Sequence, residues 1–242
     1  MDMQELFGYK GKNVVVSGAF SGMGRAAARL LSQLGAEVYV ICRRNGRHNM
    51  LDFPVKQILY ADFGNKEDLD QLAEKLPNNI FALFLCHGIA LNSDGSNTIE
   101  VQKVNFLGHK YLLEKALNKV MDRGSINIIS SSGGFDWQSS FHNCMEVIDT
   151  QTYEDALAWY ESHPKEIASG YVFSKQCLCA YVKAKVHAPE YIDRKIRLNA
   201  INPGNTIPNF IYFKTPLFAM VFWIRGRASA PIPHQFFVSA PF

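Results

Sequence analysis

The chain has 242 residues, of which 48% are hydrophobic and 19% are charged, a composition typical of a folded globular protein. Its net charge of +3 argues against nucleic acid as the main partner, because duplex binding needs clustered cationic contacts to phosphate. The longest apolar run, 216–224, is too short to cross a bilayer. The 5 cysteines, an odd number, and a polar N-terminus without a secretion signal predict reduced thiols in a cytoplasmic protein.

Strand-like and helix-like stretches alternate along the chain, which predicts an α/β fold with a parallel sheet. Short apolar runs predict strands at 13–16, 37–42, 57–61, 80–86, 125–130 and 196–201. Apolar residues at turn spacing predict helices at 25–34, 65–76, 101–119, 152–162 and 171–187. The continuous apolar run of the fourth strand indicates a strand covered on both faces. We therefore expect one domain over 1–242, a Rossmann-type, doubly wound parallel sheet with helices on both faces.

A glycine-rich loop joins the first predicted strand to the first predicted helix. Its glycines allow a tight turn and let a pyrophosphate approach main-chain N–H groups at the positive end of a helix. A Gly-x-x-x-Gly-x-Gly string alone can be an ordinary turn, but its place between a strand and a helix favours dinucleotide binding. The expected contact residues are Gly18, Ser21, Gly22, Met23 and Gly24.

The second predicted strand ends in Cys42 and is followed by Arg43 and Arg44. An acidic residue at this point would bind the 2′-hydroxyl of the adenosine ribose, whereas guanidinium groups suit a 2′-phosphate. We therefore expect NADP(H) to be preferred, with NAD(H) as the alternative cofactor. The competing interpretation is that the two arginines only keep a surface loop soluble.

Further residues at the ends of the predicted strands resemble motifs of the short-chain dehydrogenase/reductase family, over about 11–204. An Asp-hydrophobic pair follows the third strand, a segment ending in glycine follows the fourth, and a Pro-Gly pair closes the sixth. The resemblance implies that these residues contact the adenine, its ribose and the nicotinamide, in that order. They are Asp62 and Phe63, then Cys86, His87 and Gly88, then Pro203 and Gly204.

The same resemblance implies a catalytic set. Ser131 closes the fifth strand, Asn105 lies in a helix, and Tyr171 and Lys175 form a Tyr-x-x-x-Lys motif. Tyr171 and Lys175 are also expected to contact the cofactor. Each of these residues has an ordinary structural interpretation when taken alone, but their order and their elements together favour catalysis.

Position must select the catalytic tyrosine, because Tyr-x-x-x-Lys occurs 3 times, beginning at Tyr111, Tyr171 and Tyr181. The reaction of such a fold takes place at the carboxyl edge of the sheet. Tyr181 lies further along the helix of Tyr171, about 15 Å from its start. Tyr111 precedes the serine strand. Only Tyr171 opens a helix between the serine strand and the Pro-Gly strand, so we select it.

These residue types suit proton transfer to a carbonyl oxygen. Lys175 lies on the same helix face as Tyr171, and its ammonium, with the positive nicotinamide of an oxidised cofactor, favours the phenolate. Tyr171 can then donate a proton during reduction and accept one during oxidation. Ser131 would donate a hydrogen bond to the same oxygen. The resemblance implies that Asn105 holds a helix kink and a water that links Lys175 to solvent.

Ser131 and Tyr171 are 40 residues apart, farther than in most of the family, which indicates an insertion at about 135–168. This resembles the subgroup of bacterial 3α-hydroxysteroid dehydrogenase/carbonyl reductases. The insertion is expected near the helices that many relatives use for dimerisation, so the homo-oligomeric state stays open. Phe135 and Trp137 either line an apolar substrate pocket or are ordinary core aromatics.

Two further departures concern the cofactor site and the end of the chain. His87 replaces a small residue beside the expected ribose, where it either crowds the cofactor or adds a polar contact. No Asp-Gly strand follows Gly204, and 209–242 is an atypical tail rich in Pro and Phe. We therefore expect the final strand to be missing and one edge of the sheet to be uncovered.

The sequence as a whole predicts an NADP(H)-dependent oxidoreductase that interconverts a hydrophobic ketone or aldehyde and its alcohol. A steroid-like or terpenoid-like substrate suits this interpretation, and no metal is expected. The alternative is a catalytically silent or truncated dinucleotide-binding member of the family.

Overall fold

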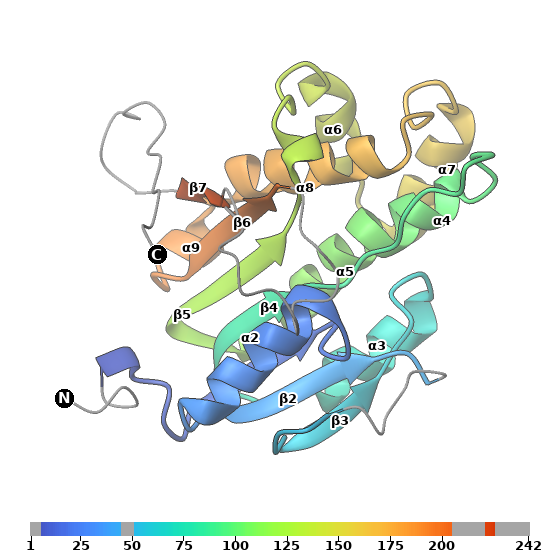
Figure 1. Ribbon diagram of the computed structural model, residues 1–242. Coiled ribbons are helices and arrows are strands. Elements are labelled where there is room, and N and C mark those ends of the chain that lie inside the picture. The colour runs from blue at the N-terminus through green and yellow to red at the C-terminus, as the bar shows by residue number, and fades with distance from the viewer. Residues whose placement is uncertain (1–5, 45–50, 205–220, 226–242) are drawn as a thin grey trace.

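The computed structural model describes residues 6–44 and 51–204, together with the backbone of 221–225. Within these residues a 7-stranded sheet has the order β3-β2-β1-β4-β5-β6-β7 (Figure 1). The strands are β1 (Asn13–Ser17), β2 (Glu37–Cys42), β3 (Gln57–Tyr60), β4 (Ile80–Leu85), β5 (Val120–Ile129), β6 (Arg197–Pro203) and β7 (Val221–Arg225). Strands β1 to β6 pair in parallel, and the strand order reverses between β1 and β4. Ligands of such folds bind at this switch point.

Helices cover both faces of the sheet, as the sequence predicts (Figure 1). The regular helices are α2 (Gly22–Gln33), α3 (Lys66–Lys75), α4 (Thr98–Gln102), α5 (Gly108–Ala116), α6 (Phe141–Ile148), α7 (Tyr153–Ser162), α8 (Tyr171–Lys185) and α9 (Pro189–Ile192). A π-helical turn, η2 (Lys103–Leu107), joins α4 to α5, and 3₁₀ turns lie at η3 (Leu117–Lys119) and η4 (Ser132–Gly134).

The side chains of β1 point alternately to the two faces of the sheet, which explains the helix layer on each face. Val14 and Val16 pack in one buried cluster with residues of α2, while Val15 lies in the larger cluster formed with α3, α5 and α8. Successive side chains of a strand point to opposite faces, so a run of three valines buries both faces at once. The continuous apolar strands therefore require helices on each side.

The edge beyond β6 differs from the prediction. The sequence lacks an Asp-Gly strand, and we expected this edge to be uncovered. Instead, β7 pairs antiparallel with β6, so the expectation of an uncovered edge is wrong in the described backbone. β7 has the sequence VFWIR, so it is not the Asp-Gly strand that we expected to be missing. An edge strand presents unpaired N–H and C=O groups, which any extended segment can satisfy, in either direction. The rest of the predicted tail lies outside the described residues.

The predicted starts of two helices are confirmed, and in both a side chain caps the first turn. Asn65 caps α3, accepting a hydrogen bond from the N–H of Asp68, and Thr152 and Asp155 form a complete capping box at α7. The predicted helix 101–119 is divided by η2, which contains Asn105. The kink implied at this residue is therefore present as a π-helical turn.

The segment predicted to be an insertion contains α6 and α7, which lie beside α8 and α4 (Figure 1). The Sγ atoms of Cys144 in α6 and Cys177 in α8 are 3.6 Å apart. The ring of Trp159 in α7 stacks on Phe173 in α8, with centroids 6.0 Å apart. The segment thus packs directly against the helix that begins with Tyr171.

Candidate active site

Most of the predicted site residues follow the ends of β1, β4, β5 and β6, which meet at the carboxyl edge of the sheet. Ser17 ends β1, and its buried Oγ accepts a hydrogen bond from the N–H of Cys86 at 3.1 Å. The N–H of Ser130, after β5, donates to the carbonyl of Ile201 in β6 at 2.8 Å. Pro203 ends β6 and is buried. The glycine loop, the ribose segment and the serine segment are therefore brought to one edge.

Two glycines shape the loop between β1 and α2. Gly18 has φ +68°, and a Cβ there would lie 2.9 Å from the backbone nitrogen of His87. A Cβ at Gly24 would lie 2.4 Å from the carbonyl oxygen of Gly18, so both positions require glycine. The first turn of α2 carries no acidic side chain, which leaves its N–H groups as a positive end. The loop fits an anionic pyrophosphate, and Ser21, Gly22 and Met23 stay predicted contacts.

The basic residues near this loop fall into two sets. Arg25 and Arg29 on α2 form ion pairs with Asp52, and the hydrogen bond from Arg29 is the main cause that lowers the pKa of Asp52 to about 2. Arg43 and Arg44 are exposed immediately after β2. The adjacent segment 45–50 lies outside the described residues. The cations of α2 are thus already paired with a carboxylate, and the 2′-phosphate assignment of Arg43 and Arg44 stays a prediction.

Phe63, His87 and His109 form a stack of rings beneath the predicted adenine and ribose segments. The imidazole centroids of His87 and His109 are 4.0 Å apart with planes 15° apart, and Phe63 lies against His87. Phe63 and His109 are buried. The carboxylate of Asp62 accepts a hydrogen bond from the N–H of Gly64 at 2.9 Å, which fixes the turn after β3.

The polar contact of His87 is made within the protein. Its Nδ1 lies 2.6 Å from Ser17 Oγ. Burial, and secondarily the positive charge of Lys175, lowers the pKa of His87 to about 3. Burial also holds the pKa of His109 well below its usual range. Both rings are therefore neutral at physiological pH, and His87 packs against protein rings.

Lys175 and Asn105 meet beside Gly88. The Nζ of Lys175 donates to the carbonyl of Ile129 at the end of β5, at 2.9 Å. Asn105 donates to and accepts from the backbone of Ile89, at 2.9 and 2.8 Å. A Cβ at Gly88 would lie 3.2 Å from Asn105 Oδ1 and 3.6 Å from Lys175 Nζ. The predicted lysine, asparagine and ribose-side glycine are thus neighbours.

Tyr171 and Ser131 flank this group. Tyr171 is the first residue of α8, and its ring centroid lies 5.5 Å from the Nζ of Lys175. Ser131 precedes η4, and its Oγ accepts a hydrogen bond from the N–H of Gly133 at 3.2 Å. A Cβ at Gly133 would lie 3.8 Å from Ser131 Oγ and 3.6 Å from Val172 Cγ2, which places the serine beside the first turn of α8.

The environment of Lys175 suits a group that exchanges protons. Its side chain is buried, and desolvation lowers its pKa to about 8, while Cys179 and Cys86 partly oppose this shift. A pKa near the working range allows both charge states to be reached. Perturbed lysines of this kind concentrate at functional sites.

The other two Tyr-x-x-x-Lys copies are engaged elsewhere. The hydroxyl of Tyr111 donates to the carboxylate of Asp70 at 2.7 Å, and Lys115 pairs with the same carboxylate at 3.5 Å. Tyr181 is buried in the core. Among the three copies, the one at Tyr171 is the copy at the carboxyl edge.

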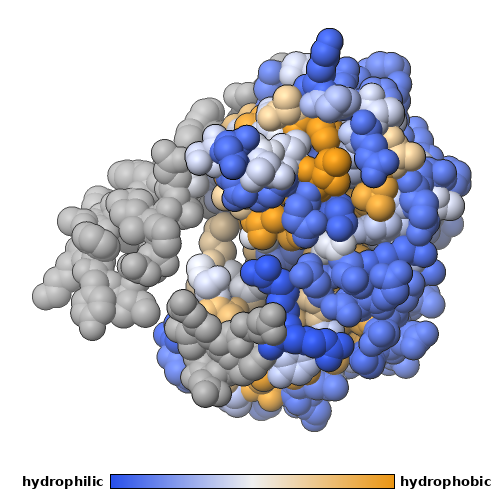
Figure 2. All heavy atoms as spheres, turned by 90° about the vertical axis from the view of Figure 1, so that its right-hand side faces the viewer, coloured by the Kyte–Doolittle hydropathy of each residue, from blue (hydrophilic) through white to orange (hydrophobic). Residues whose placement is uncertain are grey.

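Exposed apolar side chains occur on the segments that follow Ser131 and Tyr171 in the chain. Phe135, Phe141 and Val172 are 41%, 42% and 38% exposed, and the ring of Trp137 meets Phe141 edge-on with centroids 5.6 Å apart. Trp137 also packs on the main core, which supports its interpretation as a core aromatic, while its part in a substrate pocket stays a prediction. Figure 2 shows apolar residues gathered on the upper half of the face seen from the right of Figure 1.

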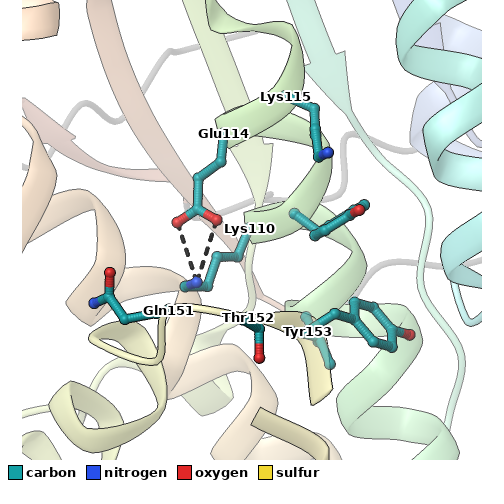
Figure 3. Close-up of a pocket in the computed structure, with 8 residues that line it drawn as sticks. Lys110, Glu114, Lys115, Gln151, Thr152 and Tyr153 are labelled. Carbon is teal, nitrogen blue, oxygen red and sulfur yellow. Dashed lines mark hydrogen bonds and ion pairs between the residues drawn. The ribbon is translucent and has the colours of Figure 1, made fainter. Parts of the chain in front are cut away.

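One cavity of about 230 Å³ lies away from these residues, between α5 and the segment that leads into α7 (Figure 3). Its buried cation, Lys110, is already paired with Glu114 at 3.1 Å and donates to the carbonyl of Thr150 at 3.0 Å. None of the predicted site residues lines it. We therefore assign the cavity no part in the chemistry.

Sequence reasoning missed two residues that hold the site. Ser17 links the start of the glycine loop to His87, and Asn202 accepts a hydrogen bond from the N–H of Ser131 through its Oδ1, at 3.3 Å. Both immediately precede motif residues, Gly18 and Pro203. In the sequence, both could have been recognised as polar residues at the end of an apolar strand, next to a motif residue.

A parallel sheet with a glycine-rich first turn and a Tyr–Lys pair at its carboxyl edge defines a Rossmann-type oxidoreductase. The family model described as short chain dehydrogenase matches residues 12–143, more than half of the chain. This chain belongs to the short-chain dehydrogenase/reductase family. It is an oxidoreductase that acts on alcohol or carbonyl groups with a nicotinamide cofactor.

Known relatives include the coniferyl-alcohol dehydrogenase of Pseudomonas sp. strain HR199, 30% identical over 194 residues, which are 80% of this chain and 72% of that protein. The (+)-cis,trans-nepetalactol synthase of Nepeta racemosa is 26% identical over 57% of this chain and 62% of its own length. The crystal structure of 3-alpha-hydroxysteroid dehydrogenase from Pseudomonas sp. B-0831 with NADH shares the fold, with a TM-score of 0.61, 20% identity, and coverage of 80% of this chain and 72% of that one.

Two features are absent from the described residues. They contain no helix with the length and apolar character needed to cross a membrane. They also contain no cluster of three or more His, Cys, Asp or Glu side chains that could bind a metal ion.

Proposed function

We propose that this protein is an NADP(H)-dependent oxidoreductase that interconverts a hydrophobic ketone or aldehyde and the corresponding alcohol. The observation that carries the proposal is the position of Tyr171 at the start of α8, with its ring 5.5 Å from a buried ammonium. An ammonium so close stabilises the negative charge that develops on the phenol oxygen while its proton is transferred.

When bound, the nicotinamide cofactor supplies the hydride to the carbonyl carbon or accepts it from the alcohol. Tyr171 donates the proton to the carbonyl oxygen in reduction and accepts it in oxidation. The Oγ of Ser131 accepts from Gly133, so its own hydrogen is available for the substrate oxygen, where negative charge develops. Asn105 braces the backbone at Ile89, next to Gly88 and Lys175.

The cofactor contacts proposed for this site follow the strand ends. The pyrophosphate lies on the glycine loop (Gly18, Ser21, Gly22, Met23 and Gly24), and the adenosine half lies near Asp62, Phe63, Cys86 and His87. The nicotinamide half lies near Gly88, Pro203 and Gly204, with Tyr171 and Lys175. The glycine requirement at Gly18 and Gly24 supports the first of these assignments.

The substrate is proposed to be hydrophobic and ring-bearing. Phe135, Phe141 and Val172 expose apolar surface on the segments that follow Ser131 and Tyr171, and an apolar ligand would cover such surface from water. The relatives are named for coniferyl alcohol, for nepetalactol and for a 3-alpha-hydroxysteroid, all of them ring-bearing molecules. These names support the proposed class without selecting one member of it.

A panel of aldehydes, ketones and alcohols, assayed by the absorbance of NADPH and NADH, tests the proposal. We expect turnover of ring-bearing carbonyls with a lower KM for NADPH than for NADH. Cofactor binding by fluorescence without hydride transfer to any carbonyl would instead identify a catalytically silent dinucleotide-binding protein.

Arg43→Ala is expected to lower the affinity for NADPH about tenfold or more while leaving that for NADH nearly unchanged. The guanidinium would form charge-assisted hydrogen bonds to the 2′-phosphate, each contributing roughly 1.5–3 kcal/mol. The ratio of the two dissociation constants, from cofactor fluorescence, is the measurement. Arg197→Ala removes the same charge at the start of β6, which is separated from β2 by β1, β4 and β5, and should leave the ratio unchanged. An unchanged ratio in Arg43→Ala would refute the 2′-phosphate assignment.

Phe141→Ala is expected to raise the KM for ring-bearing substrates several-fold, with little change for a small aliphatic aldehyde. Its exposed ring offers apolar contact that only a large substrate can use, worth roughly 1–2 kcal/mol. Phe7→Ala, which removes another exposed aromatic ring remote from the site in sequence, is the control. Equal effects on both substrate classes would exclude Phe141 from the substrate surface.

A further inference from the structure

Two amide side chains reach from neighbouring segments to the first turn of α8. Asn105, in η2, donates to Ser174 Oγ at 3.3 Å, and Ser174 in turn donates to the carbonyl of Tyr171 at 2.7 Å. Gln102, the last residue of α4, is fully buried and donates from Nε2 to the carbonyl of Gly170 at 2.7 Å. A carbonyl oxygen only accepts, so the amide nitrogen must face it. Asn105 belongs to the predicted catalytic set, whereas Gln102 has no assigned role.

The backbone at Gly170 is held in an unusual conformation. Its φ is +50° and its ψ is −95°, and a Cβ there would lie 2.6 Å from Leu91 Cδ1. Its carbonyl also accepts the first helical hydrogen bond, from the N–H of Ser174 at 3.1 Å. The peptide that leads into Tyr171 is therefore restricted on one side by Leu91 and fixed on the other by Gln102.

Helix α8 has no local capping interaction that could fix its first turn. Its N-cap is a glycine, no side chain caps its first N–H groups, and its first turn carries no acidic residue. The start of such a helix is expected to fray unless long-range contacts secure it. The two amides supply these contacts. Gln102 holds the carbonyl of Gly170, and Asn105 acts through Ser174 on the carbonyl of Tyr171.

We propose that Gln102 is a positioning residue, which fixes the Gly170–Tyr171 peptide and so holds the phenol at its distance from Lys175. This inference rests on the proposed function, because positioning has consequences only if Tyr171 transfers a proton. Gln102 touches neither substrate nor cofactor in this scheme. Its Oε1 has no partner among the described atoms, so its contribution comes through the one hydrogen bond to Gly170.

Gln102→Met keeps the length of the side chain and removes the donor. We expect kcat to fall about 10- to 100-fold, because small misplacements of a catalytic group have effects of this size. The dissociation constant of NADPH should stay within about twofold, since the glycine loop is untouched. Amide hydrogen exchange at 171–175 should accelerate, because the first turn of α8 loses an anchor.

The control is Asn199→Leu, which removes a buried amide that donates to Asn127 Oδ1 at 3.1 Å in the middle of the sheet. It should destabilise the protein without the selective fall in kcat. If the kcat of Gln102→Met stays near the wild-type value and exchange at 171–175 is unchanged, the inference is wrong. It is also wrong if the loss of kcat merely follows a loss of stability and disappears when the assay is cooled.

Failure of the proposed function has a different signature. A wild-type protein that binds NADPH but reduces no carbonyl would refute that function, and with it the catalytic consequence of Gln102. The exchange measurement would still decide whether Gln102 anchors α8, because it does not depend on turnover.

Discussion

Tyr171→Phe is expected to abolish turnover, a loss of roughly 100-fold or more, while NADPH binds with nearly unchanged affinity. The phenol is the only proposed proton donor for the substrate oxygen, and general acid–base groups contribute about 10²–10⁴-fold to a rate. Phenylalanine keeps the ring beside Lys175 and removes only the hydroxyl. Steady-state kinetics and cofactor fluorescence on the same preparation separate the two effects.

A second tyrosine provides a matched control for this experiment. Tyr111, on α5, begins another Tyr-x-x-x-Lys copy, but its hydroxyl donates to the carboxylate of Asp70 on α3. Tyr111→Phe removes a similar hydroxyl and should leave kcat unchanged. Wild-type turnover in Tyr171→Phe would refute the mechanism, and a large loss in Tyr111→Phe would show that the copy at Tyr111 takes part in catalysis.

The second large effect is a loss of stability in acid. Burial lowers the pKa of His87 to about 3, with a smaller effect from the charge of Lys175, and holds the pKa of His109 well below 6.5. In the unfolded chain both histidines would titrate near 6.5. Between about pH 6.5 and 3 the unfolded state therefore binds protons that the folded state does not. The stability is fully present above pH 6.5 and falls as the pH decreases, by about 1.4 kcal/mol per pH unit for each neutral histidine.

Urea unfolding at pH 7 and at pH 5 measures this slope. His109→Leu removes a fully buried imidazole whose two nitrogens have no hydrogen-bond partner among the described atoms. It should reduce the loss of stability between the two pH values by about 2 kcal/mol. His142→Leu, which changes an exposed histidine, is the matched control. A wild-type slope in His109→Leu would show that this ring accepts a proton in the folded state.

Much of the fold follows from local sequence signals. Each predicted strand from 13 to 201 is present, and the capping box at Thr152 starts α7 as expected. Helix α6 was not predicted, because Ser140 offers no capping hydrogen bond and the helix depends on packing Cys144 and Val147 into the core. The turn at η2 and the direction of β7 also depend on distant partners, which local spacing does not reveal.

The candidate site also divides into residues that sequence motifs predict and residues that depend on long-range contacts. The strand ends carry Gly18, Gly88, Ser131 and Gly204 to one edge because parallel strands share their direction, so motif order was sufficient to predict the set. Motif order did not predict the residues whose hydrogen bonds hold these site residues in place. The hydrogen bond from Gln102 joins residues 68 apart in the sequence, and that from Ser131 to Asn202 joins residues 71 apart.

Transfer of deuterium tests the central claim most directly. Wild-type protein, incubated with NADPH deuterated at the transferable position of the nicotinamide and with a ring-bearing aldehyde, should give an alcohol that carries the deuterium on its former carbonyl carbon. Mass spectrometry of the product reports this without any variant. An alcohol without deuterium, or no alcohol despite bound cofactor, would contradict hydride transfer at this site.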